Sequence, residues 1–434
     1  MHHFDAIVIG TGQAGPPLAA RLAGTGMKVA VIERGRFGGT CVNDGCTPTK
    51  AMIASAYAAH LARRAGEYGV LLDGVPRVDM AKVKARKDAI VTNSRSGVEQ
   101  WMQGLDGAAV YRGHARFEDP TTVEVDGERL TADRIFLDVG GRPLVPSLPG
   151  LDTVPYLTSV DMMELDSVPP HLVIIGGSYV GLEFAQMMRR FGAEVTVVEK
   201  SPRVVAREDA DVSEAIEAFL RDEGIRVRCA ATCIDVRRER DGISVGLECS
   251  DGEPRERGTH LLLAMGRSPN TDDLGLDAAG IDVDDRGYIE VDEALRTSNP
   301  RVWALGDCNG KGAFTHTAYN DYEIVASNLL ENAGRKHGDR IPVYALYTDP
   351  PLGRVGMNEA AIREAGIDAL VGRIPMTRVA RAVEKGESIG FLKVHVERGS
   401  QRILGASLLG TGADEVVHSL LDAVERPGHG DREY

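Results

Sequence analysis

Residues 6–15, Ala-Ile-Val-Ile-Gly-Thr-Gly-Gln-Ala-Gly, decide the fold of the amino-terminal part of the chain. The four apolar residues suit a buried parallel strand. An alanine-rich stretch to about Ala23 predicts a helix, and residues 28–32 predict a second strand that leads into Glu33. Strand, glycine loop, helix, strand and carboxylate together form the pattern of a dinucleotide-binding βαβ unit, whose helix N-terminus faces a pyrophosphate. The three glycines of this pattern are Gly10, Gly12 and Gly15.

The same pattern returns in the middle of the chain. Residues 172–175 predict a strand, and the loop Gly176-Gly177-Ser178-Tyr179-Val180-Gly181 follows. A helix over 182–190 and a strand over 194–198 then lead to Glu199. Gly176 and Glu199 are 23 positions apart, as are Gly10 and Glu33. Serine replaces the middle glycine, which weakens this second nucleotide site without abolishing it.

Each unit is followed by a second repeated feature. Residues 121–137 alternate around Asp126-Gly127, a hairpin signal, and lead to Gly140-Gly141-Arg142-Pro143. Residues 243–264 alternate around Asp251-Gly252 and lead to Gly266-Arg267-Ser268-Pro269. These repeats predict an α/β fold with two Rossmann-like dinucleotide-binding domains, one inserted in the other.

The last third of the chain has no glycine fingerprint. Residues 343–355 and 388–409 predict antiparallel strands, with helices near 358–365 and over 414–424. We therefore expect a carboxy-terminal α+β domain. The predicted domains are a first dinucleotide-binding domain (1–148 and 272–338), a second dinucleotide-binding domain inserted in it (149–271), the carboxy-terminal domain (339–424) and a disordered tail (425–434).

Composition narrows the classes of function. Lys and Arg number 50 against 64 Asp and Glu, so the net charge is −14, which argues against nucleic acid or an anionic membrane as the main partner. No apolar run approaches the ~18 residues of a membrane-spanning helix. The N-terminus lacks the basic and apolar regions of a signal peptide, so we expect a cytoplasmic protein. Its six cysteines should then not form a structural disulfide framework.

The chemical centre lies at residues 38–50, Gly-Gly-Thr-Cys-Val-Asn-Asp-Gly-Cys-Thr-Pro-Thr-Lys. Cys41 and Cys46 are five apart, and a helix is predicted from about residue 48, so its dipole favours the thiolate of Cys46. Gly45 permits the close turn that lets the two sulfurs meet. A zinc site would need a second Cys/His pair, which the sequence lacks, so no metal is expected. Two inert buried thiols are the remaining alternative.

At this point the chain resembles the pyridine nucleotide–disulfide oxidoreductases, a family that includes mercuric reductase and dihydrolipoamide dehydrogenase. The resemblance runs from residue 4 to about 424. The motifs that carry it are both glycine fingerprints, Gly-Gly-Thr-Cys-x4-Cys-x-Pro-x-Lys, Gly113-His114-Ala115, Ala264-Met265-Gly266-Arg267 and Ala304-Leu305-Gly306-Asp307.

The resemblance implies a role for individual residues. Cys46 would be the sulfur that contacts the flavin, and Cys41 the sulfur that exchanges with substrate. Lys50 and Glu183 would form an ion pair beside the flavin, although Glu183 could also be a helix-surface charge. FAD would be bound by Gly10, Gly12, Gly15, Glu33, Thr40, Lys50, Ala115, Asp307 and Thr315. The nicotinamide nucleotide would be bound by Gly176, Tyr179, Gly181, Glu199 and Gly266.

The resemblance also implies a reaction, in which hydride passes from the nicotinamide through FAD to a Cys41–Cys46 disulfide. Glu199 predicts NAD(H) over NADP(H), because its carboxylate would accept the ribose 2′-OH and repel a 2′-phosphate. Lys200, Arg203 and Arg207 are near enough to blunt that repulsion. The expected substrate is a small-molecule disulfide, a metal–thiolate or a quinone, and the expected assembly is a homodimer.

The sequence departs from the family near its end. Members that act on thiols carry a His-Pro-Thr…Glu motif as general acid–base, whereas His429 here has no following proline. The Cys-Cys pair of mercuric reductases is also missing from this sequence. We therefore expect a chain truncated by ~30 family residues, with a weakened dimer. Two alternatives to the disulfide enzyme stay open: an NADH diaphorase or quinone reductase, and an inactive FAD-binding remnant.

Overall fold

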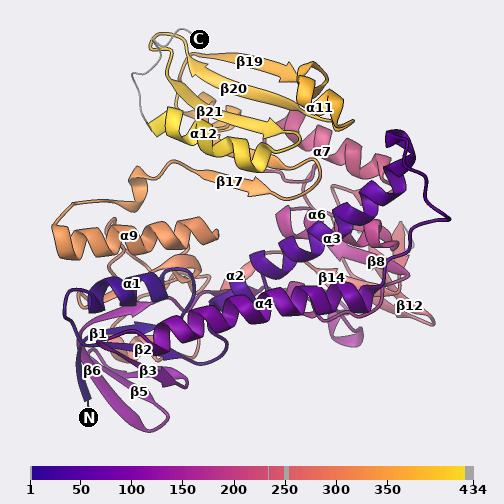
Figure 1. The fold of residues 1–434 in the computed structure, drawn as a ribbon. Helices are drawn as coiled ribbons and strands as arrows, with labels where there is room; N and C mark the ends of the chain where they lie inside the picture. Colours follow the sequence, from indigo (N-terminus) through magenta and orange to yellow (C-terminus); the bar gives the residue numbers. More distant parts are fainter. Residues whose placement is uncertain (1, 233, 249–253, 426–434) are drawn as a thin grey trace. The chain divides into compact units, whose positions relative to one another are not determined.

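The computed structural model describes residues 2–232, 234–248 and 254–425 (Figure 1). The chain divides into two compact units, each made of three segments. The first unit consists of residues 1–51, 85–144 and 266–340, and the second of residues 52–84, 145–265 and 341–434. Three of the crossings, after residues 144, 265 and 340, fall close to the predicted domain boundaries. The expected tail, residues 426–434, lies outside the described residues.

A seven-stranded sheet forms the framework of the first unit. Its parallel part has the order β3-β2-β1-β6, and β16 also pairs with β6 in parallel. A hairpin adds β5 and β4 in antiparallel orientation. The strands are β1 (His2–Ile9), β2 (Val29–Glu33), β3 (Ala108–Arg112), β4 (Ala115–Asp119), β5 (Thr122–Val125), β6 (Glu128–Leu137) and β16 (Val302–Ala304).

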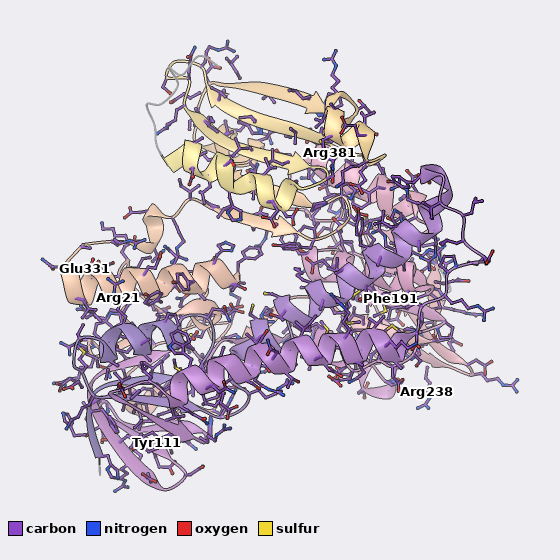
Figure 2. The ribbon with its side chains drawn as sticks, viewed as in Figure 1. Arg21, Tyr111, Phe191, Arg238, Glu331 and Arg381 are labelled. Carbon is purple, nitrogen blue, oxygen red and sulfur yellow. The ribbon has the colours of Figure 1, made fainter. Side chains whose placement is uncertain are left out.

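Both faces of this sheet are buried, which explains the unbroken apolar run of β1. Ile7 and Ile9 belong to one core cluster, whereas Ala6 and Val8 belong to another on the opposite face. The second cluster is covered by α1 (Gly15–Ala23) and α9 (Thr315–Glu331). Arg21 of α1 and Glu331 of α9 form an ion pair at the ends of these helices (Figure 2).

In the first unit, the residues at the hairpin turn and at the start of α1 suit the backbone found there. The hairpin between β5 and β6 turns at Asp126 and Gly127, with φ of 50° and 87°, as a type I′ turn requires. The first two positions of α1 include Pro16, where a missing N–H costs nothing. Two long helices carry the chain between the units: α3 (Cys46–Arg64) and α4 (Met80–Gln103).

The second unit contains the second βαβ pattern. Its parallel sheet has the order β10-β9-β8-β14, and a separate three-stranded sheet packs on it through a shared core that includes Val173 and Ile243. The parallel strands are β8 (His171–Ile175), β9 (Glu194–Val198), β10 (Arg226–Arg228) and β14 (His260–Leu263). The smaller sheet has β11 (Val236–Glu239), β12 (Gly242–Gly246) and β13 (Arg255–Gly258), and the helices are α6 (Tyr179–Phe191) and α7 (Ala210–Asp222).

The carboxy-terminal part of the second unit is a five-stranded antiparallel sheet with the order β17-β18-β21-β20-β19. One face is covered by α12 (Ala413–Glu425), drawn in yellow in Figure 1. The expected strands and both expected helices are present. The other strands are β17 (Val343–Leu346), β18 (Leu352–Gly356), β19 (Ala369–Pro375), β20 (Phe391–Glu397) and β21 (Ile403–Leu409), and two short helices are α10 (Glu359–Glu364) and α11 (Ala380–Glu384).

Candidate active site

The first glycine loop has the backbone that its sequence predicts. Gly10 has φ of 102°, and a Cβ there would lie 2.1 Å from the carbonyl oxygen of Asp138. A Cβ on Gly15 would lie 2.3 Å from the carbonyl oxygen of Gly10. Neither position can hold a side chain, because both clashes are with backbone. The loop therefore brings the N-terminus of α1 to the carboxyl edge of the sheet, where dinucleotides bind in this fold.

Glu33 lies across this loop at the end of β2. Its Oε2 accepts hydrogen bonds from Thr11 N at 2.9 Å and Thr11 Oγ1 at 2.6 Å, and its Oε1 accepts one from Gly35 N at 2.8 Å. These contacts fix the carboxylate beside the glycine loop, as expected for the acidic residue of a dinucleotide-binding unit.

The two cysteines of the chemical centre lie on successive helices. Cys41 lies in α2 (Gly39–Asn43), and Cys46 is the first residue of α3. Thr315 Oγ1, at the start of α9, lies 3.0 Å from Cys46 Sγ and 3.4 Å from Cys41 Sγ. One hydroxyl therefore contacts both sulfurs. Gly45 closes the turn between them, since a Cβ there would lie 3.0 Å from Thr40 O.

Both cysteines are thiols in this structure, with Cys41 partly buried and Cys46 exposed. The hydrogen bond with Cys46, followed by burial, raises the pKa of the Cys41 thiol well above its usual range. The Cys41 thiol therefore favours its protonated form. Cys46 has the more open position, at a helix N-terminus where a thiolate is favoured.

Arg267 joins several of the expected FAD residues, a role that sequence reasoning missed. Its Nε donates to Asp307 Oδ2 at 2.9 Å, and Nη2 donates to Gly141 O and, at 3.4 Å, to Thr40 Oγ1. Asp307 itself lies in the short 3-10 helix η3 (Gly306–Asn309). The repeated Gly-Arg motif was the available signal, but it gave no partner for the arginine.

Asp321 of α9 is a second positioning residue that the sequence did not indicate. Its side chain is fully buried, and Oδ2 accepts hydrogen bonds from Gly306 N at 2.8 Å and Asn309 Nδ2 at 2.9 Å. Arg340 completes an ion pair with its other oxygen. Asp321 therefore holds the turn that carries Asp307. Ala115, another expected FAD contact, is the buried first residue of β4.

The second glycine loop repeats the geometry of the first within the second unit. A Cβ on Gly176, whose φ is 118°, would lie 2.3 Å from Ala264 O, and one on Gly181 would lie 2.0 Å from Gly176 O. Glu199 Oε2 accepts from Gly177 N at 2.6 Å, and Oε1 accepts from Ser201 N at 2.7 Å. The carboxylate thus lies beside its loop as Glu33 does beside the first.

Tyr179, the first residue of α6, is held by a buried acid. Its hydroxyl donates to Glu208 Oε1 at 2.9 Å, and the Tyr344 hydroxyl of β17 donates to the same oxygen at 2.7 Å. The Glu208 side chain is fully buried, and Arg354 Nε lies 3.8 Å from its Oε2. Burial raises the pKa of Tyr344 to about 12 and moves that of Tyr179 in the same direction. Both phenols therefore stay protonated as donors.

Lys50 and Glu183 belong to different units, so their ion pair stays a prediction. Glu183 is only 7% exposed, and its Oε1 accepts a hydrogen bond from Tyr347 N at 3.0 Å. The alternative of a helix-surface charge is therefore wrong. Gly266, expected beside the nicotinamide nucleotide, is the first residue of the last segment of the first unit and has φ of 122°.

Of the remaining cysteines, Cys308 is buried and Cys229 is partly buried. Burial raises the pKa of the Cys229 thiol to about 11 and that of Cys308 further, so both thiols stay protonated at neutral pH. Cys233 and Cys249 lie outside the described residues.

One acidic cluster in the described part of the second unit has the spacing of a metal site: Asp209, Glu359 and His395. The Lys393 ammonium already lies there, 2.9 Å from Asp209 Oδ2, 2.9 Å from Glu359 Oε1 and 2.6 Å from Asp211 Oδ1. A bound cation would have to displace this buried side chain, so the cluster is better described as a lysine-centred ion network.

Two nucleotide-type glycine loops, a Cys-x4-Cys pair and an antiparallel carboxy-terminal sheet define a flavoprotein disulfide reductase. The chain belongs to the pyridine nucleotide-disulphide oxidoreductase family: the family model matches residues 4–321, and the model of the family's dimerisation domain matches residues 343–427. Its members are FAD-dependent enzymes that use a pyridine nucleotide.

Named relatives are similar over almost the whole chain. The mercuric reductase of Streptomyces lividans is 36% identical over 97% of this chain and 90% of its own length. The dihydrolipoyl dehydrogenase of Haloferax volcanii is 34% identical over 97% and 90%. Among solved structures, the HOCl-induced flavoprotein disulfide reductase RclA of Escherichia coli superposes with a TM-score of 0.88 at 33% identity, covering 97% of this chain and 93% of that one.

Among the described helices, none is both long and apolar enough to span a bilayer.

Proposed function

We propose that Cys41 and Cys46 form the redox-active disulfide of this FAD-dependent enzyme and that NADH supplies the electrons. The observation that carries the proposal is the shared contact of both sulfurs with Thr315 Oγ1, at 3.0 and 3.4 Å, in the unit with the first glycine loop. Two inert core thiols would have no reason to share a contact with one hydroxyl group. Neither of them would need to be exposed at a helix N-terminus, as Cys46 is.

The cysteines divide the chemistry between them. Opening the disulfide breaks one S–S bond and takes up two electrons from the nicotinamide nucleotide and one proton. Cys41 Sγ keeps that proton because its pKa is raised, and Cys46 Sγ is left as the thiolate. The Thr315 hydroxyl lies 3.0 Å from Cys46 Sγ, where it can donate to that thiolate, and in this structure it donates to Cys41 Sγ at 3.4 Å. Bound FAD supplies the two-electron relay between the nucleotide and the disulfide.

Several residues would hold that cofactor in the first unit. The glycines at 10, 12 and 15 leave room for a pyrophosphate, and Glu33 is placed for a ribose hydroxyl. Arg267 and Asp321 orient Asp307, and Thr40 and Ala115 are within the same unit. Lys50, which is also in this unit, would lie beside the flavin ring.

The second unit would bind the nicotinamide nucleotide through Gly176, Gly181 and Glu199, with Tyr179 in the nicotinamide pocket. We propose NADH because Glu199 would repel a 2′-phosphate. We propose a small disulfide or a metal–thiolate as the substrate, in keeping with the names of the relatives. The dimerisation domain supports a homodimer, which light scattering tests. We also propose a cytoplasmic location, which cell fractionation tests.

Anaerobic titration with NADH tests the proposed disulfide. The FAD-loaded protein should consume about two equivalents, one for the flavin and one for the disulfide, with a long-wavelength thiolate–flavin absorbance after the first. The Cys41→Ser variant should consume only one equivalent of NADH. Its long-wavelength absorbance should come from the Cys46 thiolate alone. Cys229→Ser, a cysteine outside the site, should match the unchanged protein.

Consumption of a single equivalent by the unchanged protein would contradict the disulfide and favour the diaphorase or quinone reductase. A flavin that NADH does not reduce at all would favour the inactive FAD-binding remnant.

A further inference from the structure

Asp138 lies at the carboxyl end of β6, directly beside the first glycine loop. Its backbone N donates to Ile9 O at 2.8 Å, which places it level with the point where β1 enters the loop. Asp138 as a whole residue is only 6% exposed. An ionisable group buried at the carboxyl edge of a parallel sheet lies where this fold receives its ligand.

The carboxyl group of Asp138 is in contact with the loop itself. Oδ2 accepts a hydrogen bond from Gly15 N at 2.7 Å, the first amide of α1. A Cβ on Gly12 would lie 2.9 Å from Oδ2 and 3.1 Å from Oδ1. A Cβ on Gly306 would lie 3.4 Å from Oδ1. The group therefore fills the space between the glycine loop and the turn that carries Asp307.

Two anions would compete for this helix N-terminus when a dinucleotide binds. The pyrophosphate of FAD approaches the second glycine of such a loop and the first amides of the helix, which are the groups that Asp138 already contacts. An ionised Asp138 would repel the pyrophosphate at short range in a buried site. A neutral carboxyl group would instead offer an O–H donor, and hydrogen bonds to phosphate oxygens are of the stronger, charge-assisted kind.

The surroundings favour the neutral form. Burial raises the pKa of Asp138 to about 8, although the amides of Gly15 and Ala14 act in the opposite direction. The charged side chains that act on it from the neighbouring elements, Asp307 of η3 and Glu33 of β2, are both acids and add to the rise. The Cys308 thiol, with its own raised pKa, stays neutral.

We propose that Asp138 is an FAD-binding residue whose neutral carboxyl group donates a hydrogen bond to the cofactor's pyrophosphate from beneath the glycine loop. This inference rests on FAD binding by the first unit. If Asp138 has this role, FAD affinity depends on the protonation of one buried acid. The glycine pattern alone does not predict such a dependence. Between neutral and alkaline pH, FAD binding and proton uptake are then linked.

The test measures the Kd of FAD for the apoprotein by flavin fluorescence between about pH 6.5 and about pH 9.5. Affinity should fall above about pH 8, approaching tenfold for each pH unit, as one linked proton requires. Asp138→Asn keeps an acceptor for Gly15 N and an N–H donor but cannot ionise, so its Kd should be independent of pH. Asp133→Asn, an exposed position on the same strand, should keep the original profile.

Calorimetry of the unchanged protein gives a second readout that needs no variant. At about pH 8.5, FAD binding should take up a large fraction of one proton, seen as a buffer-dependent heat. A Kd that is constant with pH, no proton uptake, or an Asp138→Asn profile like that of the unchanged protein would overturn the role of Asp138. Failure to bind FAD at every pH would instead overturn the assignment of FAD to this protein as well.

Discussion

At the scale of single residues, Glu33 and Glu199 show how one geometry serves two units. Each carboxylate accepts a hydrogen bond from a backbone amide of its own glycine loop, from Thr11 N at 2.9 Å and from Gly177 N at 2.6 Å. Their equal spacing from the first glycine made both predictable, because the βαβ unit has a nearly fixed length.

Glu199 carries the first prediction, which concerns nucleotide choice. Glu199→Gln keeps an acceptor for Gly177 N but removes the charge that would repel a 2′-phosphate, so the ratio of kcat/KM for NADH over NADPH should fall by about tenfold or more. Steady-state kinetics with a dye acceptor measures it. Glu194→Gln, an exposed position on β9, is the matched control. An unchanged ratio in Glu199→Gln would remove this residue from nucleotide selection.

Residues without a local pattern were the ones that sequence reasoning missed. Arg267 contacts Asp307, 40 positions later, and Asp321 holds the turn at Gly306 from the next helix. Asp138 contacts Gly15, which is 123 positions earlier. No periodicity links such positions, since the sheet order β1-β6 brings them together only after folding. The glycines of the two loops, by contrast, were predictable because the βαβ fingerprint fixes their spacing, even though a Cβ on Gly10 would meet the distant Asp138 O.

At the scale of elements, predictions succeeded where burial was continuous and failed on an exposed edge. Strands β1 and β8 are unbroken apolar runs because both of their faces are covered. Strand β19 was not predicted, because it is the edge of its sheet and most of its residues are exposed, Val371 and Ile374 included. An edge strand shows little of the alternation that marks a half-buried strand.

The network around Lys393 carries the prediction for this scale. Lys393 of β20 is 1% exposed and pairs with Asp209 and Asp211 at the start of α7 and with Glu359 of α10. Lys393→Met would leave three carboxylates close together, one of them buried, and should lower the free energy of unfolding by about 3 kcal/mol at neutral pH.

The destabilisation caused by Lys393→Met should also depend on pH. Hydrogen bonds from His395 and Lys393 lower the pKa of Asp209 against the opposing effect of burial. Its contribution to stability is therefore full above its unfolded pKa of about 4 and is lost as pH falls below it. The cost of Lys393→Met should shrink over the same acidic range. Urea unfolding measures it, with Lys385→Met, a more exposed pair partner of Glu387, as a control that should cost less than about 1 kcal/mol.

At the scale of the whole molecule, the path of the chain explains why its length alone did not predict how it divides into units. Each unit is assembled from three separate segments, and the chain crosses between units inside α3 and α4. The inserted second nucleotide unit was predictable from its repeated motifs. The assignment of residues 52–84 to the second unit was not, because helices α3 and α4 continue through the boundary without a break in pattern.

The last prediction asks which unit binds which cofactor. FAD should protect backbone amides of residues 1–51, 85–144 and 266–340 from hydrogen exchange, because a ligand stabilises the fold that binds it, by about 2.7 kcal/mol at a hundredfold excess over Kd. A non-oxidisable NADH analogue added to the FAD-loaded protein should protect residues 145–265 instead, with the loop at 176–181 most affected. Gly15→Ala, whose Cβ would lie 2.3 Å from Gly10 O, should lose the protection by FAD, and the analogue added to this FAD-free variant should still protect residues 145–265. Protection of both glycine loops by FAD alone would contradict this division, since each loop would then contribute to a single cofactor site.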